Sequence, residues 1–329
     1  MKTVAFFNNK GGVGKTSLVY HVAWMFAELR LRVITADLDP QANLSSMFLP
    51  PETLEGIWND DGHNTIHSAM APLIRGTGDI REPVIMRVDD RIGLLIGDLA
   101  LSRYEDELSA QWPKCLAREE RAFRVTTAFD RLIDAACREF GADVALVDVG
   151  PNLGAINRAA LIACDYVVIP LGPDMFSLQG LRNKGPALRD WRRDWEDRRS
   201  RSPTLDFRLP LGRMDALGYV IMRHSVRLDR PVKAYAQWIE RMPKEFRSSV
   251  LNEQNMRVPR IEDDPHCLAQ FKDYRSLMPM AQESNKPMFL LKPGDGAIGG
   301  HQTAVQSCYT DFKQLALEIA KRCGIGIPA

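Results

Sequence analysis

The chain has 329 residues, of which 45% are hydrophobic and 26% are charged, a balance typical of a soluble globular protein. The formal net charge is +1, so no overall field indicates a nucleic-acid or membrane partner. The six cysteines form no C-x-x-C pair, which argues against a disulfide scaffold and favours reduced thiols in the cytoplasm. A strand-like run follows Met1-Lys2 directly, so we expect no secretory leader, and no apolar run is long enough to span a bilayer.

The first elements predict a parallel sheet. Thr3–Phe7 is short, apolar and β-prone, helical periodicity begins at Lys15, and Arg32–Ala36 is a second β-type run. Strand, loop, helix and strand in this order open a doubly wound fold. We therefore predict one α/β domain over residues 1–329, a mostly parallel twisted sheet with helices on both faces. Later β-type runs are Ile92–Ile96, Val144–Val147, Tyr166–Ile169 and Leu217–Met222. Helical patterns between and beyond them are Glu119–Phe140, Ala155–Ala163, Leu178–Trp195 and Tyr309–Cys323.

Two segments fit this alternation less well. Pro50–Arg91 is rich in Pro, Gly and Asp and is interpreted as an excursion of loops and short helices. Ser200–Gly212 contains turn residues and is interpreted as a surface connection. Neither segment interrupts the predicted order of strands.

The segment KGGVGKTS, residues 10–17, predicts a phosphate-binding loop. It follows a strand and opens a helix, and Gly14-Lys15-Thr16 matches the end of G-x-x-x-x-G-K-[ST], although Asn9 replaces the first glycine. Glycine amides approach phosphate oxygens closely, and the helix N-terminus favours anions. In this motif the lysine reaches the β and γ phosphates and the hydroxyl ligates Mg²⁺. The alternative is a glycine turn with incidental lysines. The predicted nucleotide-binding residues in the loop are Lys10, Gly11, Gly12, Val13, Gly14, Lys15, Thr16 and Ser17.

The variant loop resembles the deviant Walker A motif of the ParA/MinD superfamily of P-loop ATPases, most of all the ParA/Soj-type partition proteins. The resemblance implies that Lys10 reaches across a dimer interface to the ATP of the partner. A cation supplied in this way stabilises the charge on a γ-phosphate in transfer. Hydrolysis would then depend on dimerisation, with Lys10, Lys15 and Asp39 as the catalytic residues.

The same resemblance assigns three carboxylates. Asp148 ends the apolar run VALVD and matches the Walker B aspartate that holds Mg²⁺, while Thr16 supplies the hydroxyl. In ADLDPQ, Asp39 matches the residue that orients the attacking water, and Asp37 matches an acidic partner near the metal. The alternative for Asp37 and Asp39 is a strand end that caps the next helix. The family usually has two prolines after the Walker B aspartate, whereas this chain has Gly150-Pro151, a change that bears on the stiffness of the loop.

Further segments extend the resemblance, strongly to about residue 185 and more weakly beyond. DYVVIPLGPDMFSLQGL and GLLIGDLALSRYEDEL are similar to family segments on either side of the Walker B strand. RVPRIEDDP is similar to a stretch that borders the adenine in relatives, so Pro259 is assigned to the nucleotide site. The segments 50–91 and 200–212 have no counterpart that we can name.

Residues 181–260 form a basic second half. They contain 19 Lys and Arg against 10 Asp and Glu, an excess hidden by the net charge. Such a surface attracts duplex DNA through counterion release without reading its sequence. ParA-type proteins bind DNA non-specifically through this half, and we take Arg223, Arg227 and Arg230 as the DNA-binding residues because fewer acids surround them. The alternative is a helix whose mixed charges form salt bridges in solvent.

Other residues are interpreted as structural. Trp191 and Trp195 lie four apart and could stack on bases, but packing against a neighbouring element is favoured. His21 is expected to be a packed histidine in the first helix. The six histidines have no ligand spacing with the cysteines, so no zinc site is predicted.

The favoured function is a slow ATPase that binds ATP or ADP with Mg²⁺ and forms a nucleotide-sandwich homodimer. It would bind DNA on the nucleoid in the cytoplasm and position plasmid, chromosome or other cargo, with hydrolysis stimulated by a ParB-like protein. One alternative is a MinD-like membrane-cycling ATPase, which would need a basic amphipathic C-terminal helix. The apolar face of Tyr309–Cys323 has small residues, so we expect no membrane binding. Another is a metabolic ATP-dependent enzyme, either a ligase or an iron–sulfur protein, for which Cys164 is the one cysteine near the nucleotide switch.

Overall fold

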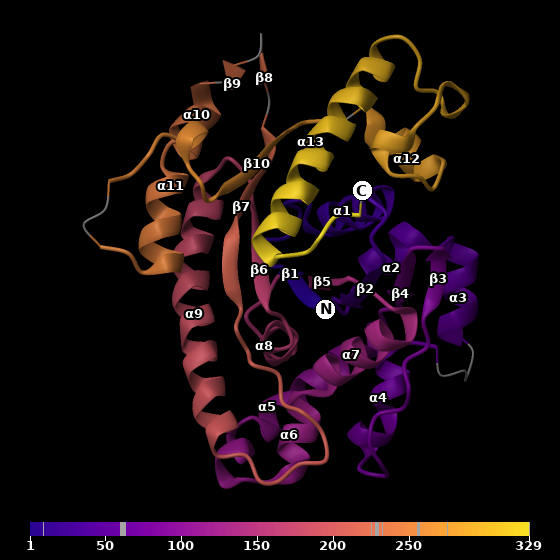
Figure 1. Cartoon of the computed structure of the whole chain (residues 1–329), viewed down its shortest axis with the longest axis vertical. Helices are drawn as coiled ribbons and strands as arrows, with labels where there is room; N and C mark the ends of the chain where they lie inside the picture. Colours follow the sequence, from indigo (N-terminus) through magenta and orange to yellow (C-terminus); the bar gives the residue numbers. More distant parts are fainter. Residues whose placement is uncertain are drawn as a thin grey trace.

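In the computed structural model, the described residues are 1–8, 10–59, 64–224, 226–227, 230–231, 233–254, 257–274 and 276–328. Their strands form an eight-stranded sheet in the order β10-β7-β6-β1-β5-β2-β4-β3 and a separate pair, β8-β9 (Figure 1). Within the large sheet, β3 pairs antiparallel with β4 and the other neighbours are parallel.

The strands of the large sheet are β1 (Lys2–Phe6), β2 (Val33–Leu38), β3 (Met86–Asp89), β4 (Ile92–Leu95), β5 (Val144–Val149), β6 (Tyr166–Leu171), β7 (Asp215–His224) and β10 (Cys267–Lys272). The pair is β8 (Val226–Arg227) and β9 (Arg230–Pro231). The α-helices are α1 (Lys15–Glu28), α2 (Asn43–Phe48), α3 (Pro51–Asn59), α4 (Ile66–Arg75), α5 (Tyr104–Gln111), α6 (Glu120–Thr126), α7 (Ala128–Phe140), α8 (Ala155–Ile162), α9 (Met175–Ser200), α10 (Lys233–Ile239), α11 (Met242–Glu245), α12 (Leu277–Glu283) and α13 (Gly300–Cys323). A π-helical turn, η3 (Phe246–Leu251), follows α11.

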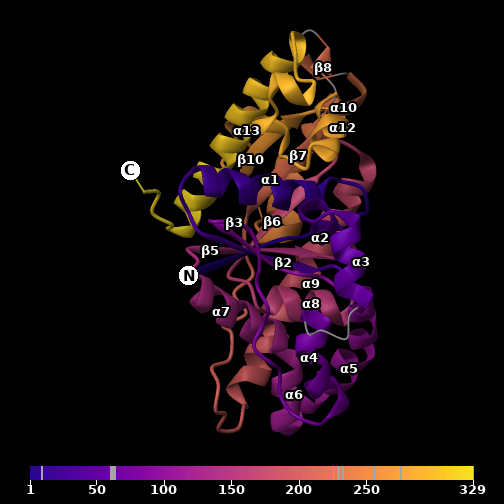
Figure 2. The ribbon, with the colours of Figure 1, turned by 90° about the vertical axis from the view of Figure 1, so that its right-hand side faces the viewer.

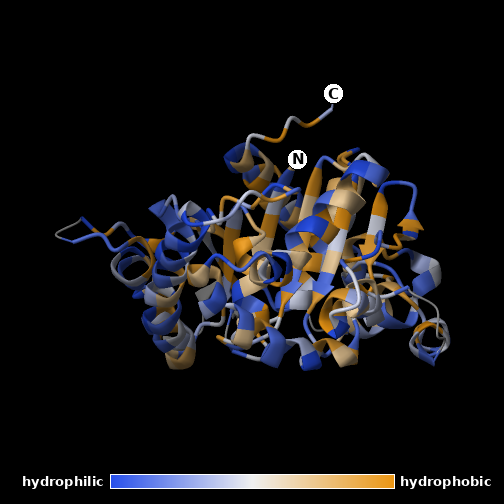
Figure 3. Ribbon diagram, turned by 90° about the horizontal axis from the view of Figure 1, so that it is seen from below, coloured by the Kyte–Doolittle hydropathy of each residue, from blue (hydrophilic) through white to orange (hydrophobic). Residues whose placement is uncertain are grey.

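Alternate residues of each central strand enter opposite cores, which is why the sheet is covered on both faces. In β1, Val4 and Phe6 pack with α1, α2 and α13. Ala5, and Phe7 just after the end of β1, pack on the other face with α4 to α9. Figure 2 shows the strands between these two layers, and Figure 3 shows hydrophobic strands with hydrophilic residues on the outer helices. Burial on both faces explains the continuous apolar runs of the central strands. The predicted doubly wound α/β fold is confirmed.

The largest differences from the predicted elements lie at the sheet edges and in one helix. The strands β3 and β10 were not predicted, because their sequences MRVD and CLAQFK mix polar and apolar residues and are only partly buried. The predicted helix Glu119–Phe140 is two helices, α6 and α7, that meet at Thr127. The hydroxyl of Thr127 donates to the carbonyl of Phe123 at 2.7 Å, a side-chain bond that competes with regular helix geometry.

The two segments without a family counterpart have definite structures. Residues 50–91 form α3, α4 and the edge strand β3, so the expected excursion also extends the sheet. In the segment Ser200–Gly212, Ser200 ends α9, and residues 201–212 cross the surface without a helix or strand, as expected for a connection. Trp195 is fully buried, stacks on Trp112 at 6.1 Å and donates to the carbonyl of Pro210, which confirms its packing role.

The C-terminal helix α13 is part of the body of the protein. Its apolar face, including Phe312, Leu315 and Ile319, is buried against α1 and the sheet. Among the helices of the described residues, none is long and apolar enough to cross a bilayer.

His21 ties α1 to the C-terminal region, as expected for a packed histidine. The amide of Met288 donates to its Nε2 at 3.1 Å, so Nδ1 carries the proton and donates to the carbonyl of Ser17 at 2.6 Å. The ring stacks on Phe312 at 4.9 Å. Burial lowers the pKa of His21 from 6.5 to about 4, because a charged ring would lose water and its acceptor role.

This geometry predicts an acid-sensitive stability. Above pH 6.5 the His21 ring is neutral in both the folded and the unfolded protein. Below this pH the ring binds a proton in the unfolded chain, whereas in the folded protein it stays neutral down to about pH 4. We expect the wild-type free energy of unfolding to fall by roughly 2–3 kcal/mol relative to His21→Gln between pH 7 and pH 4.5. Urea unfolding across this range measures the difference, with His301→Gln as the control that should follow the wild type. Parallel curves for wild type and His21→Gln would contradict the assignment.

Candidate nucleotide site

The phosphate loop follows β1 and has the backbone of an anion cradle. Gly12 and Gly14 have positive φ values of 73° and 84°, which glycine adopts without strain. Gly14 is the N-cap of α1, so the loop amides and the positive end of this helix face the same side. A Cβ built on Gly11 or Gly12 would meet nothing within 4 Å, so the surface beside these residues is open.

Lys15 and Thr16 turn toward β5. The Nζ of Lys15 lies 3.1 Å from Oδ1 of Asp148 and 3.8 Å from Oδ2 of Asp39, and the lysine side chain is only 7% exposed. The hydroxyl of Thr16 donates to Oδ2 of Asp148 at 2.7 Å. Asp39 also accepts from the amide of Gln41 at 3.0 Å. The structure therefore brings together four of the residues predicted to carry the phosphate and metal chemistry.

Asp37 lies beside Asp148, because the two residues are register partners on the parallel strands β2 and β5. Its Oδ2 accepts from both the amide and the hydroxyl of Ser45, each at 2.7 Å. Burial, and then the neighbouring Asp148, raise the pKa of Asp37 to about 7. Ser45 was not predicted as a site residue. It is the third residue of α2, and the bond from its amide to Asp37 fits the alternative in which an aspartate at the strand end caps the next helix.

Three buried polar atoms of this cluster lack a hydrogen-bond partner: Nζ of Lys15, Oδ1 of Asp37 and Oδ1 of Asp148. The ion pair between Lys15 and Asp148 is close but not aligned as a hydrogen bond. Burial also raises the pKa of Asp148, although Lys15 and Thr16 oppose that effect. Buried polar atoms without partners are costly, and a cation with a polyphosphate would satisfy them.

The donor set fits Mg²⁺. Hydroxyl and carboxylate oxygens suit this hard cation, which usually takes one or two carboxylates and completes its shell with water and phosphate oxygens. Among the described residues, no cluster of three His, Cys, Asp or Glu side chains is arranged to hold a metal by itself. Thr16 and Asp148 could ligate the ion directly, with Asp37 next to them.

Lys10 has its side chain held within the same chain. Its Nζ lies 2.5 Å from Oδ2 of Asp174, the N-cap of α9, and 5.8 Å from the centre of the Phe176 ring. Burial raises the pKa of Asp174, but hydrogen bonds from Lys10 and Ser177 outweigh it, so the net pKa is lowered. Lys10 is one-third exposed, which leaves it accessible to another molecule. Asp174 was not singled out from the sequence.

The loop after β5 is braced by one side chain. Asn157 on α8 accepts from the amide of Gly150 and donates to the carbonyls of Gly150 and Asn152. This clamp stiffens the Gly150-Pro151 turn, where the family usually has two prolines. Asn157 could not be predicted from the sequence, because its role depends on contacts with Gly150 and Asn152 that form only in the fold.

A cavity of about 350 Å³ adjoins the start of α1 and has the size and lining expected for a base. It is lined by Gly14, Ser17, Met222, Tyr235, Phe271, Lys272, Asp273, Tyr274, Met278, Pro279, Gln282, Met288 and Phe312. Pro259 lies in the irregular segment before β10 and is not among these residues. The lining thus brings the turn after β10 beside the phosphate loop, and the assignment of Pro259 to the nucleotide site stays a prediction.

The arginines of the basic second half divide into two groups. Those on α9 and at its C-cap are largely engaged within the protein: Arg182 pairs with Glu245, Arg193 with Asp190, and the C-cap residue Arg201 with Asp197. This matches the alternative of a mixed-charge helix. Arg223, Arg227 and Arg230 lie on β7, β8 and β9, and their side chains lie outside the described part of the structure.

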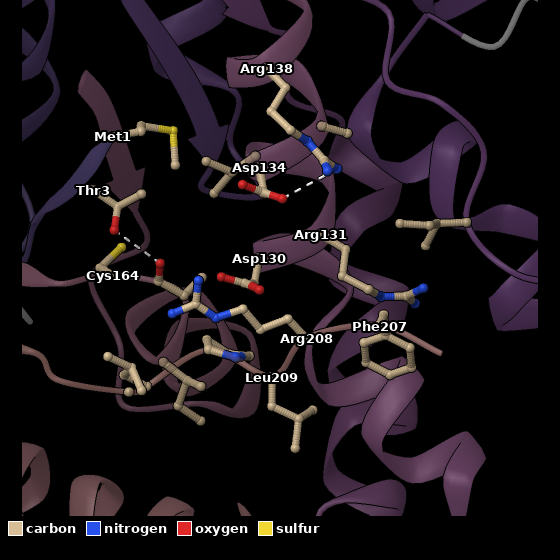
Figure 4. Close-up of a pocket in the computed structure, with 18 of the residues that line it drawn as sticks. Met1, Thr3, Asp130, Arg131, Asp134, Arg138, Cys164, Phe207, Arg208 and Leu209 are labelled. Atoms are coloured by element: carbon tan, nitrogen blue, oxygen red, sulfur yellow. Dashed lines mark hydrogen bonds and ion pairs between the residues drawn. The ribbon is translucent and has the colours of Figure 1, made fainter. Parts of the chain in front are cut away.

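A second cavity, of about 640 Å³, lies near the first residues of β1 and β6, at the end of the strands opposite the phosphate loop. In Figure 4, Arg208 extends toward Asp130, and Thr3 and Cys164 line the opposite wall. Burial raises the pKa of Asp130 to about 7. Cys164 is buried, and its thiol donates to the carbonyl of Ala160. This cavity is separate from the candidate nucleotide site.

Comparison with known proteins gives the family. A family model described as an AAA domain (AAA_31) matches residues 1–192. The proteins similar to this chain in sequence include a virulence plasmid ParA family protein, pGP5-D of Chlamydia psittaci. The chain belongs to the ParA/MinD superfamily of P-loop ATPases. The predicted resemblance is confirmed.

Individual relatives of this ParA/MinD-superfamily chain match part of it in sequence. IncC of Escherichia coli is 35% identical over 185 residues, which cover 55% of this chain and 44% of IncC. For pGP5-D the identity is 27% over 183 residues, covering 55% of this chain and 61% of the relative. The match thus spans about half the length of the curated relatives.

Two solved structures cover nearly the whole chain. Protein DIP2308 from Corynebacterium diphtheriae has a TM-score of 0.72 and 25% identity, and the match covers 98% of each chain. An ATP complex of Cyanothece McdA has a TM-score of 0.64 and 13% identity, covers 100% of this chain and 98% of McdA, and shares the fold.

The metal assignment leads to a test on Asp148. Mg²⁺ should strengthen ATP binding by wild-type protein, and Asp148→Asn should lose about tenfold or more of that strengthening while it retains binding in EDTA. Calorimetric titration with ATP gives the affinity in the presence of Mg²⁺ and the affinity in EDTA. Asp143→Asn, exposed at the other end of the β5 strand, is the matched control and should behave as wild type. An unchanged Mg²⁺ effect in Asp148→Asn would remove this residue from the metal site.

Proposed function

We propose that this chain is a partition-type ATPase that binds ATP with Mg²⁺, pairs with a second copy and binds DNA non-specifically in the paired state. The observation that carries the proposal is the group of buried polar atoms without partners at Lys15, Asp37 and Asp148, beside an open glycine loop on a helix N-terminus. Membership of an ATPase superfamily and the ATP complex of McdA, a protein of the same fold, support this choice.

The residues of the site divide the work of phosphate transfer. The amides of Gly11 to Thr16 and the ammonium of Lys15 bind the polyphosphate, and Thr16 with Asp148 would hold Mg²⁺. The bound ion would neutralise charge on the phosphate oxygens. Asp39, whose Oδ2 is 3.8 Å from Nζ of Lys15, would orient an attacking water.

Pairing with a second copy would complete the site through Lys10. A lysine supplied by the partner stabilises the charge that spreads over the γ-phosphate during transfer. Phe176 and Met175 are 65% and 54% exposed, and the Lys10 ammonium lies over the Phe176 ring, so apolar surface surrounds the cation. A surface of this kind supports association of two copies. A subunit alone would hydrolyse ATP slowly, and a ParB-like activator would set the rate.

DNA binding rests on the charge of the second half. Because the α9 arginines are engaged with acids of the same chain, the excess cations would act mainly from the end of β7 through β9, where Arg223, Arg227 and Arg230 lie. Two such surfaces on one dimer bind duplex DNA more tightly than one. The apolar face of α13 is buried on the sheet, which favours DNA over a membrane as the surface on which the dimer cycles. The cargo would be a plasmid, a chromosome or another large body on the nucleoid.

Lys10→Ala tests the link between nucleotide and pairing. Wild-type protein with ATP and Mg²⁺ should sediment with about twice the mass of the ADP-bound form, and Lys10→Ala should bind ATP but remain monomeric and lose its activated hydrolysis, by on the order of a thousandfold. Analytical ultracentrifugation measures the mass. Lys114→Ala, which removes an exposed lysine between α5 and α6, is the control. Mass independent of nucleotide in the wild type would contradict the proposed cycle.

Changing Arg223, Arg227 and Arg230 together to Ala tests the DNA surface. Affinity for duplex DNA with ATP should fall uniformly across sequences, and the slope of log affinity against log salt should decrease by up to about three. Fluorescence anisotropy at several salt concentrations gives the slope. The triple change of the exposed residues Arg75, Arg118 and Arg138 to Ala is the matched control. An equal loss in both triple variants would mean that these three positions are not special.

A further inference from the structure

Lys184 is a buried lysine for which the proposed chemistry has no use. It lies on the inner face of α9, and its side chain is 0% exposed. Lysine side chains are almost never fully buried without a partner, because the ammonium group loses its water. The contacts of Lys184 therefore indicate what it does.

Its partner is Asn8, which lies between the end of β1 and the phosphate loop. The Nζ of Lys184 donates to Oδ1 of Asn8 at 2.7 Å, across 176 residues of chain. The same oxygen accepts from the backbone amide of Lys10 at 3.0 Å, and Nδ2 of Asn8 donates to the carbonyl of Pro170. Two donors on one side and a carbonyl on the other fix the orientation of this carboxamide.

The helix that carries Lys184 is itself fixed. A Cβ on Gly185 would lie 1.8 Å from the carbonyl oxygen of Ser249, so α9 and η3 are in direct backbone contact at the next residue. Arg189 donates to the same carbonyl and to that of Val250. The amine is thus held on a rigid support that connects the phosphate loop to the basic second half.

Charged groups on the elements around Lys184 are occupied elsewhere. They are Arg182 with Glu245, Arg247 with Asp264, and Lys10 with Asp174. Burial lowers the pKa of Lys184 to about 7, and no nearby carboxylate offsets it among the described residues. A polyphosphate bound at the adjacent loop would be the counter-charge that favours the protonated amine.

We propose that Lys184 is a positioning residue of the phosphate site, whose buried amine holds the Asn8 carboxamide and so fixes the start of the loop at Lys10. The inference rests on the proposed nucleotide binding. It assigns to α9 a direct role in shaping the loop. Lys184 acts through Asn8 on the backbone amide of Lys10 and does not contact the nucleotide itself. Removing the amine should loosen the loop without removing any group that contacts phosphate.

Lys184→Met separates this role from a purely structural one. Methionine has a similar length and no donor, and replacing a buried charge with an apolar side chain leaves folding stability unchanged or raised. ATP–Mg²⁺ affinity should nevertheless fall by about tenfold, the value of one charge-assisted hydrogen bond. Calorimetry gives the affinity and urea unfolding gives the stability. Arg182→Met, which removes a half-exposed cation two residues earlier on α9, should leave ATP affinity unchanged.

Two further readouts make the test specific. Asn8→Ala should weaken ATP binding as Lys184→Met does. The double variant should bind ATP no more weakly than the more affected of the two single variants, because both changes break the same series of hydrogen bonds. The ratio of wild-type to Lys184→Met affinity should shrink as pH rises from 6.5 to 8.5, since the amine loses its proton over this range.

The outcomes distinguish this inference from the function beneath it. If wild-type protein fails to bind ATP–Mg²⁺, the proposed function fails. If wild type binds and folded Lys184→Met binds equally well at every pH, the function stands and the positioning role of Lys184 is wrong.

Discussion

The structure depends on an imbalance of charge at the ends of β2 and β5. Asp37, Asp39 and Asp148 converge there against one buried ammonium, that of Lys15. Two of these carboxylates are fully buried, where ionised groups of like charge repel strongly. Such an arrangement is costly for the protein alone, and it becomes favourable when a divalent cation and a polyphosphate enter together. The cost is the physical signature of a binding site.

The elements around the cluster connect it to the rest of the molecule. The phosphate loop runs from β1 into α1, which His21 fastens to the C-terminal region. Asp174 caps α9 and forms an ion pair with Lys10. Lys184, further along the same helix, donates a hydrogen bond to Asn8 just before the loop. Because α9 contacts η3 through Gly185, a change at the loop has a continuous packed route to the basic second half.

Sequence reasoning succeeded where the signal was local. The KGGVGKTS loop, the strand that carries Asp148 near its end and the DLDP turn each combine a motif with its expected strand or helix, and the structure brings them together. It was less successful where a residue acts through the fold. Ser45, Asn157 and Lys184 find their partners only after distant segments pack, and no spacing predicts that. The edge strands β3 and β10 lacked a clear pattern, because edge strands are half-exposed and carry polar residues.

The central claim, that the amides from Gly11 to Ser17 hold a polyphosphate with Mg²⁺, can be tested by hydrogen exchange at peptide resolution. The account predicts that saturating ATP–Mg²⁺ slows exchange at these amides, more than ATP in EDTA does, and that peptides from the cavity near Asp130 are unaffected. Exchange in the loop that is the same with and without ATP–Mg²⁺ would contradict it.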